Sequence, residues 1–435
     1  MARPAQTRQV QARSAPKGGP DPLGTPARRA AMRLLDAVLR RGEPLEAALP
    51  LATRALPGGP DRGLAHAIAA ETLRRLPDLD ALIDSATKQR LPDDAKARFA
   101  LRIALVQALA LGTPPHAAIA TVLPLMDGGP RRLVHGVFGT LLRAGATLPE
   151  APTLPPAVAA RWTAAWGPET VAAASRAIAA PPPLDLTLKD AAGTDAWADK
   201  LGGISLAPGH VRLTDAAPVA DLPGYDEGAW WVQDLAATLP ARLLADAGDT
   251  VLDLCAAPGG KSLQLAAQGK RVTAVEISES RAARLRDNRT RTGLGFDIAI
   301  ADVLDWAPPA PVDAVLIDAP CSATGIFRRH PDVLHRAHDG VIADMAALQA
   351  RILDRAADWV KPGGTLLYAT CSLEPAEGEE QAARFLAARP DYAVRPAADL
   401  PVAPTRDGFV RTLPGTLAEA GGCDGFYVAR FVRGH

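Results

Sequence analysis

The chain has 435 residues, which is enough for about three domains. Its 48 basic and 48 acidic side chains cancel, which argues against a protein that coats nucleic acid with its whole surface. No apolar run is long enough to span a membrane, and the four cysteines form no CxxC pair. We therefore expect no membrane segment, no metal site and no disulfide framework, but a cytoplasmic protein with reduced thiols.

The zero net charge hides an uneven distribution. Residues 1–150 carry 21 Lys and Arg against 13 Asp and Glu, whereas residues 151–435 carry 27 against 35. This asymmetry indicates either a basic front that faces nucleic acid or simply more solvated arginines, and charge alone does not decide between them. Within that front, residues 1–24 are polar and lack the apolar segment of a signal peptide, so we expect a disordered basic tail.

Residues 25–148 have helical periodicity throughout. Met32, Leu35, Val38 and Leu39 recur at helical spacing. Clusters of Pro and Gly separate the further predicted helices, which are 62–75, 78–88, 93–111, 116–125 and 131–143. Short connections between helices predict a compact all-helical domain over 25–148.

A different pattern follows the helical domain. A Pro-rich linker covers 149–157, and a helical pattern covers 157–180. Strand-like pieces come next, at 184–189 and 211–213. We expect a small α/β connector domain over 149–228.

From residue 229 onward, strands alternate with helices. Apolar strands are predicted at 250–254, 272–275, 296–301, 314–317 and 365–369, and helices at 261–268, 280–292 and 341–360. This alternation is typical of a doubly wound parallel sheet with helices on both faces. The segments 408–413 and 426–432 have no helix between them and are predicted to pair antiparallel at the sheet edge. The expected fold class is therefore α/β.

The loop at 255–261 follows the first of these strands. Ligands of a doubly wound sheet bind beyond the carboxyl ends of the strands, and small residues here allow a ligand close to the backbone. Gly260-Lys261-Ser262 looks like the end of a phosphate-binding P-loop, but that motif needs Gly where Cys255 stands. The dinucleotide pattern GxGxxG is absent too, so a P-loop nucleotidase is disfavoured.

Carboxylates follow the second and third strands. Glu276 could accept hydrogen bonds from both hydroxyls of a ribose, and Asp302 is placed to meet an adenine edge. Each alone could equally be a local residue, Glu276 as a helix-capping partner and Asp302 as a turn former. Their occurrence at successive strand ends favours a nucleoside ligand.

Cysteines follow the fourth and fifth strands. Asp318 and Cys321 end the fourth strand and Cys371 ends the fifth, so the two thiols can face one pocket. A free cysteine is most often a buried apolar residue, but small polar neighbours at the ligand-facing edge favour catalysis. The pattern does not decide which cysteine attacks, and Cys423 has no predicted role.

Several of these stretches together resemble one family. The stretches 253–261, 318–321, 328–332 and 369–372 resemble the motifs of the bacterial Sun-type (RsmB-like) RNA cytosine-5 methyltransferases, and 232–234 resembles the stretch before them. The helical front resembles a NusB-like RNA-binding domain, with a short match around His116. This resemblance covers nearly the whole chain beyond the tail, and implies a Rossmann-like class I methyltransferase domain over 229–435.

The resemblance also implies cofactor, substrate and residue roles. The methyl donor would be S-adenosylmethionine, held by Cys255, Ala256, Ala257, Pro258, Gly259, Gly260, Lys261, Glu276, Asp302 and Asp318. Cys371 would be the nucleophile, Cys321 would assist product release, and Asp318 would contact the base. We also expect Arg328 and Arg329 to contact RNA phosphates, with ordinary surface charge as the alternative. The expected reaction is methylation of C5 of a cytosine in small-subunit (16S) ribosomal RNA by a monomeric cytoplasmic enzyme.

The sequence departs from the family pattern at two places and leaves rival functions open. Glu276 stands where Asp is more usual, and Leu334-His335 stand where the family commonly has Lys-Trp. A transfer RNA cytosine-5 methyltransferase remains an alternative, which the helical front opposes weakly. A non-catalytic RNA-binding assembly factor is another, which the two intact cysteines oppose.

Overall fold

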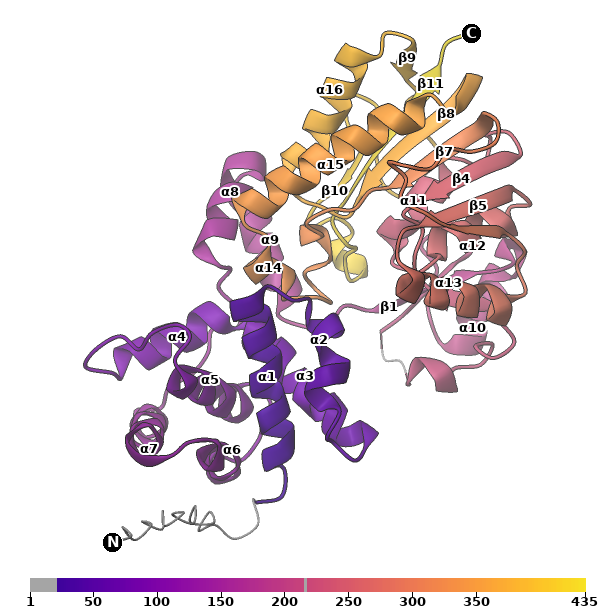
Figure 1. Ribbon diagram of the computed structural model, residues 1–435. Coiled ribbons are helices and arrows are strands. Elements are labelled where there is room, and N and C mark those ends of the chain that lie inside the picture. Colours follow the sequence, from indigo (N-terminus) through magenta and orange to yellow (C-terminus); the bar gives the residue numbers. More distant parts are fainter. Residues whose placement is uncertain (1–21, 215–216) are drawn as a thin grey trace, which may run out of the picture.

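The computed structural model describes residues 22–214 and 217–435 (Figure 1). The predicted tail therefore falls almost entirely outside the described residues. Within the described part of the chain, no helix combines the length and the apolar character needed to cross a membrane.

The amino-terminal region is a bundle of helices around one buried helix. That helix, α5 (Lys96–Leu109), is buried continuously from Ala97 to Gln107, because its apolar residues lie all around it. Its two buried arginines pair with acids on a neighbour, Arg98 with Asp84 at 2.6 Å and Arg102 with Asp80 at 2.7 Å. The surrounding helices are α1 (Thr25–Arg41), α2 (Leu45–Thr53), α3 (Gly59–Arg74), α4 (Leu76–Ser85), α6 (Pro115–Val122) and α7 (Gly128–Arg143).

The connector region begins with two helices where one was predicted. The expected helix at 157–180 is split into α8 (Pro156–Trp166) and α9 (Pro168–Ile178). Gly167 between them has a φ of 82°, and Pro168 lacks the N–H needed to continue the first helix.

A three-stranded antiparallel sheet follows, in the order β2-β1-β3. It consists of β1 (Leu184–Leu188), β2 (His210–Leu213) and β3 (Trp230–Val232), with α10 (Thr194–Leu201) between the first two. β3 lies beyond the boundary predicted at residue 228, but it completes this sheet because Leu186 pairs with Val232.

The carboxyl-terminal region is built on a larger sheet with the strand order β10-β11-β8-β7-β4-β5-β6, and β9 pairs with β11. The strands are β4 (Thr250–Leu254), β5 (Arg271–Glu276), β6 (Asp297–Ile300), β7 (Val312–Asp318), β8 (Val360–Thr370), β9 (Tyr392–Val394), β10 (Val410–Thr412) and β11 (Phe426–Arg433). β4 to β8 pair in parallel, and β11 joins β8 antiparallel. The predicted antiparallel pair at the edge is confirmed as β10 and β11.

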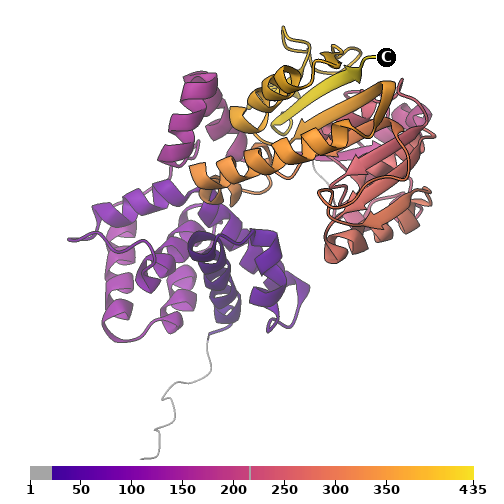
Figure 2. The same ribbon diagram turned by 45° about the horizontal axis from the view of Figure 1, so that its top comes forward.

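Helices cover both faces of this sheet, as predicted. The face that contains Val251 and Leu316 packs against α11 (Leu235–Arg242), α12 (Gly260–Ala267) and α13 (Glu279–Thr292). The opposite face packs against α15 (Asp339–Ala357) and α16 (Glu379–Ala388), and Figure 2 shows α15 lying along it. The fold is therefore the predicted α/β arrangement, with a helical region, a small connector and a Rossmann-like doubly wound sheet.

A short segment after β7 joins this sheet to the helical bundle. Residues 328–336, which we call the docking segment, end in α14 (Val333–Arg336) and contact the ends of α1, α2 and α3 (Figure 1). Asp332 accepts a hydrogen bond from the first N–H of α2, at Leu45 (3.2 Å), and Arg336 donates to the carbonyl of Gly42 (2.8 Å). The helical bundle is thus fastened to the chain that leaves the sheet near Cys321.

The docking segment explains the departure at Leu334-His335. Leu334 is buried among the apolar residues of α8 and α9, and His335 forms a 2.8 Å hydrogen bond to the carbonyl of Leu73. Burial lowers the pKa of His335, so the neutral ring donates this hydrogen bond. In this chain the pair therefore forms part of the contact between two regions.

Candidate active site

The carboxyl ends of β4, β5, β7 and β8 meet at one edge of the large sheet. A cavity of about 360 Å³ lies there, lined by parts of the 255–261 loop together with Asp318, Gln233, Asn288 and Arg291. The 255–261 loop connects β4 to α12, so its last residues present the amino-terminal amides of that helix. The edge at which sequence analysis placed the ligand is therefore also where the structure has a cavity.

The 255–261 loop is held from outside by neighbouring side chains. Arg281 donates to the carbonyl of Ala257 at 2.9 Å, and Asn288 donates to that of Pro258 at 3.1 Å. Cys255 has a φ of 61°, and burial together with the charge of Asp318 raises the pKa of its thiol to about 12. Cys255 therefore stays neutral and serves the loop through its backbone.

The two predicted ligand carboxylates lie at the ends of β5 and β6. Glu276 is buried, accepts hydrogen bonds from the N–H groups of Ala257 (3.3 Å) and Ser278 (3.0 Å), and so lies beside the 255–261 loop. Asp302 accepts from the N–H of Leu304 at 2.8 Å, the contact of a turn former. Both carboxylates thus make local contacts in addition to lying at strand ends.

An exposed apolar side chain that sequence analysis missed lies next to Glu276. Ile277 is 63% exposed, although it directly follows a buried strand. Its sequence signal was weak, because a single isoleucine after a strand is ordinary. Ile277 directly follows Glu276 at the end of β5, so an exposed apolar side chain lies at this strand end.

An ion pair between a buried lysine and a partly exposed aspartate lies at the site. Lys261 Nζ is 2.7 Å from a carboxylate oxygen of Asp318 and 5.2 Å from the centre of the Phe426 ring. Burial alone would lower the pKa of Lys261, but the charges of Asp318 and Asp253 outweigh it and raise that pKa. Lys261 therefore stays charged beside Asp318.

The two predicted cysteines are brought together. Cys321 Sγ and Cys371 Sγ lie 3.5 Å apart. The hydrogen bond to Cys371, together with burial, raises the pKa of Cys321 well above its usual value, and either sulfur can be the donor of this hydrogen bond. Lys261 also interacts electrostatically with Cys371, and this interaction contributes to the raised pKa of Lys261. The structure thus brings the two thiols into direct contact, and the assignment of Cys371 as the nucleophile stays a prediction.

Glu377 is a buried residue near the thiols that sequence analysis also missed. Its carboxylate accepts hydrogen bonds from Ser322 and Ser372, the residues that directly follow the two cysteines. Its residue type carried no signal, because Glu377 belongs to an acidic stretch before a helix, which is typical of a solvated surface.

Arg328, predicted to contact RNA phosphates, lies inside the protein. Its side chain is 4% exposed and pairs with Asp424 (3.1 Å) and Asp234 (3.3 Å). It also donates to the carbonyl of Gly421. With its guanidinium buried and occupied, Arg328 is not available to a phosphate, and that expectation is corrected.

Arg329 lies closer to the surface, with its side chain 26% exposed. It pairs with Asp234 at 3.3 Å and donates to the carbonyl of Pro183. It also lines the cavity beside Lys261, so a substrate could reach it.

Asp253 is a buried carboxyl behind the 255–261 loop. It accepts a hydrogen bond from Ser262 at 2.5 Å, while its other oxygen has no hydrogen-bond partner among the described residues. Burial raises the pKa of Asp253 to about 7. Its ordinary pKa is near 4 in the unfolded chain, so between about pH 4 and pH 7 the folded state binds more protons and loses stability as the pH rises.

We therefore expect Asp253→Asn to gain stability relative to the wild type as the pH rises from 5 to 8. The amide keeps the acceptor for Ser262 and does not ionise, so the gain over this pH range would be at most about 3 kcal/mol. Urea unfolding at several pH values measures it. Asp313→Asn is the matched control, because hydrogen bonds to Lys361 and Thr250 lower the pKa of Asp313 and its titration lies below this range. Parallel stability curves for Asp253→Asn and the wild type would contradict the prediction.

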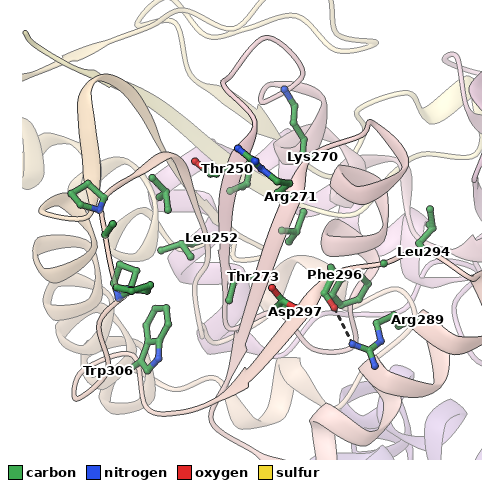
Figure 3. Close-up of a pocket in the computed structure, with 18 of the residues that line it drawn as sticks. Thr250, Leu252, Lys270, Arg271, Thr273, Arg289, Leu294, Phe296, Asp297 and Trp306 are labelled. Atoms are coloured by element: carbon green, nitrogen blue, oxygen red, sulfur yellow. Dashed lines mark hydrogen bonds between the residues drawn. The ribbon is translucent and has the colours of Figure 1, made fainter.

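A larger cavity lies at the opposite edge of the sheet. It has a volume of about 870 Å³ and is lined by the first residues of β4, β5, β6 and β7 (Figure 3). Figure 3 shows Trp306 and Phe296 at this cavity, with Arg289 bound to the Phe296 carbonyl. Because it lies at the amino ends of the strands, this cavity is remote from the two thiols and is not the candidate active site.

The parallel strands β4 to β8, the loop after the first of them and the acids after the next two have the arrangement of a class I methyltransferase domain. Comparison with known proteins gives the family. A model of the family described as 16S rRNA methyltransferase RsmB/F matches residues 241–432, and the NusB family matches residues 25–128.

Curated relatives extend over nearly the whole chain. Ribosomal RNA small subunit methyltransferase B of Klebsiella pneumoniae (strain 342) is 34% identical over 430 residues, which cover 93% of this chain and 97% of that protein. The protein of the same name from Sodalis glossinidius is 36% identical over 413 residues, covering 87% and 95%. The chain therefore belongs to the RsmB/F family of 16S rRNA methyltransferases, which confirms the resemblance.

Solved structures support the fold. The crystal structure of PH0851 has a TM-score of 0.72 at 23% identity and covers 94% of this chain and 98% of that one. NSun6 from Pyrococcus horikoshii, solved with SFG, has a TM-score of 0.55 at 16% identity and covers 65% and 98%. At these identities the likeness concerns the fold alone.

Proposed function

We propose that this protein transfers a methyl group from S-adenosylmethionine to C5 of a cytosine in small-subunit ribosomal RNA, through a covalent bond between Cys371 and C6 of the base. The observation that carries the proposal is the pair of sulfurs 3.5 Å apart, with the Lys261–Asp318 pair at the same strand ends. This arrangement supplies a nucleophile, a proton-bearing neighbour and charged groups for the base at one place.

The residues at the strand ends fit the donor. Asp302 offers a carboxylate for an adenine edge, and the exposed Ile277 offers an apolar surface for a flat base. Glu276 is buried beside the 255–261 loop and pairs with Arg281 at 3.4 Å, so a ribose would have to share its carboxylate with these partners. The 255–261 loop brings backbone close to the same place, and the acids suit a ligand with a positive charge. When bound, the donor supplies an electrophilic methyl group on a sulfonium.

Cys371 can activate the methyl acceptor, which is C5 of the cytosine. C5 of cytosine is a poor nucleophile, and addition of a thiolate at C6 makes it enamine-like and able to take the methyl group. This is covalent catalysis, in which one difficult step is divided into easier ones. Asp318 can accept a hydrogen bond from the N4 amino group of the base, and Lys261 holds Asp318 in place.

Cys321 is placed for the last stage of the reaction. Loss of the C5 proton and departure of the Cys371 thiolate restore the aromatic base. Cys321 keeps its proton and lies 3.5 Å from the sulfur that departs, so it can hydrogen-bond to that sulfur as the C–S bond breaks. We therefore propose that Cys321 assists product release.

The relatives named ribosomal RNA small subunit methyltransferase B support ribosomal RNA as the substrate. The base has to be turned out of its stack, because C6 must be reached face-on. The test is incubation with labelled donor and either unmodified 16S ribosomal RNA or transfer RNA. We expect label in the ribosomal RNA, released as 5-methylcytosine on digestion. Label in transfer RNA alone would overturn the ribosomal assignment, and donor binding without transfer to either RNA would favour a non-catalytic factor.

We further propose that the helical bundle binds the RNA. A cavity of about 960 Å³ between α1, α2 and the start of α5 is lined by exposed basic side chains, among them Arg33, Arg54 and Lys96. Basic side chains that contact phosphates release counterions from the RNA, so such binding weakens as salt rises. We also expect a monomer in the cytoplasm.

We expect Arg33→Glu/Arg54→Glu to weaken RNA binding and to reduce the slope of log affinity against log salt by roughly 1 to 2, with donor affinity unchanged. Filter binding at several salt concentrations measures the slope. Arg271→Glu/Arg351→Glu makes the same charge change at exposed positions of the catalytic region and is the matched control. Equal slopes for the two double variants would argue against this surface.

A further inference from the structure

We propose that Glu377 is a positioning residue that fixes the distance between the two reactive thiols. This inference rests on the proposed function, in which the proton on Cys321 has to face the sulfur of Cys371. In the part of the chain that the structure describes, Glu377 hydrogen-bonds to the serines that follow the cysteines and to neither sulfur, and we infer that it acts through these serines.

The carboxylate of Glu377 joins two loops that are far apart in the sequence. One oxygen accepts the N–H of Ser322 at 2.8 Å and the side-chain amide of Gln349 at 3.1 Å. The other accepts the hydroxyls of Ser322 and Ser372, the latter at 2.5 Å. Because Ser322 follows Cys321 and Ser372 follows Cys371, one carboxylate sets the position of both cysteine backbones.

Glu377 is itself fixed to the sheet. Its backbone carbonyl accepts hydrogen bonds from the hydroxyls of Tyr368 (2.7 Å) and Thr370 (3.3 Å), both in β8. The cysteine that ends β8 and the acid that holds the opposite loop are therefore anchored on the same strand. Movement of the loop after β7 would have to break hydrogen bonds to a group that does not move with it.

Two further hydrogen bonds join the loop after β7 directly to the loop after β8. Gly325 donates its N–H to the carbonyl of Cys371 at 2.9 Å, and Leu373 donates its N–H to the hydroxyl of Thr324 at 3.0 Å. Gly325 is required at this contact, since a Cβ there would lie 2.9 Å from the Cys371 carbonyl oxygen and 2.0 Å from that of Gly425. The loops are thus in direct contact, and Glu377 fills the space between their first residues.

The carboxylate of Glu377 carries an unfavourable feature that stability alone does not explain. Within the described residues it is fully buried, and none of its hydrogen-bond partners is a cation. Burial raises its pKa. Burying a carboxyl without a counter-charge is unfavourable, and such groups gather at functional sites. The Glu377 carboxylate accepts hydrogen bonds from four donors at the base of both cysteine loops, which an apolar residue could not do.

Two conservative variants distinguish positioning from charge. Glu377→Gln keeps the length of the arm, its carbonyl can still accept from Ser322 N–H, and its amide can donate to the serine oxygens. Glu377→Asp keeps the charge, but its side chain is one methylene shorter, so the carboxylate lies farther from the two serines. A positioning role predicts that Gln stays within about threefold of the wild type, whereas Asp lowers kcat by about 10- to 100-fold with the KM for RNA and the donor affinity little changed. A role of the charge predicts the reverse order.

The second readout measures the thiols without any methyl transfer. Diamide, a diazene, oxidises two neighbouring thiols: an S–S bond forms, two S–H bonds break, and the diazene takes up both hydrogens as the hydrazine. We expect the Cys321–Cys371 disulfide to form about tenfold more slowly in Glu377→Asp than in the wild type or in Glu377→Gln, because exchange depends on access between the sulfurs. Mass spectrometry of the peptides identifies the bond.

Glu374→Asp is the matched control. Glu374 is a buried glutamate three residues away in the same loop, but its carboxylate faces Arg161 and Trp162 instead of the thiols. We expect this variant to lose stability while its disulfide forms at the wild-type rate. Wild-type disulfide rates in Glu377→Asp, or equal slowing in Glu374→Asp, would overturn the positioning role. If the wild type methylates no RNA, the proposed function fails, and the disulfide rates still decide the role of Glu377.

Discussion

Replacing Cys371 by Ala is expected to abolish methyl transfer, by about 10⁴-fold or more, and to prevent any covalent protein–RNA complex. The variant retains the donor site, because Cys371 lies at the end of β8 and the 255–261 loop follows β4. Donor binding should therefore stay close to that of the wild type. Denaturing gels of protein with labelled RNA detect the adduct, and scintillation counting detects the transfer.

Cys321→Ala should give the opposite picture. The adduct forms, because Cys371 is intact, but it breaks down slowly without a proton donor 3.5 Å from the departing sulfur. A covalent complex should accumulate. Cys423→Ala is the matched control, since Cys423 is a buried thiol whose pKa burial raises to about 12, and we expect it to retain activity. Full activity in Cys371→Ala would refute the mechanism.

The second large effect is expected for Asp318→Ala. It removes the acceptor for the base, which we expect to lower kcat by about 10²- to 10³-fold. It also leaves the buried ammonium of Lys261 without its 2.7 Å partner, which we expect to destabilise the fold by roughly 3 kcal/mol. Single-turnover kinetics and urea unfolding measure the two effects separately.

Asp313→Ala is the control for this prediction. Asp313 lies on the same strand, β7, but near its amino end, where it pairs with Lys361 at the opposite edge of the sheet. We expect a moderate loss of stability and wild-type kinetics. If Asp318→Ala and Asp313→Ala lose the same stability and neither loses activity, Asp318 is a structural residue only.

The strands and their ends were predictable because each depends on a short stretch of sequence. An apolar run followed by small or acidic residues marks a strand end, and parallel strands bring such ends together. The placement of Glu276, Lys261 and Cys371 at one edge follows from that rule. Pairing of the sulfurs at 3.5 Å then needs only adjacent strands, β7 and β8.

What escaped prediction depends on partners far away in the chain. The residues next to Arg328 in the sequence are polar and typical of a surface. Its partners Asp234 and Asp424 are each more than 90 residues away in the chain and pair with it inside the protein. β3 was not predicted as a strand, because its partner strand lies more than 40 residues earlier in the chain. Glu377 was missed for the same reason, since its role depends on Ser322 across the site.

The docking segment has a consequence for the choice of nucleotide. It runs directly from the loop of Cys321 to the ends of α1, α2 and α3, where Asp332, His335 and Arg336 hydrogen-bond to the bundle. An RNA held by those helices would thus be held at a set distance from the sulfur of Cys371. The enzyme would then select its target by distance. A cytosine would be methylated when the folded RNA places it at that distance from the RNA segment bound by the helices, whatever bases surround it.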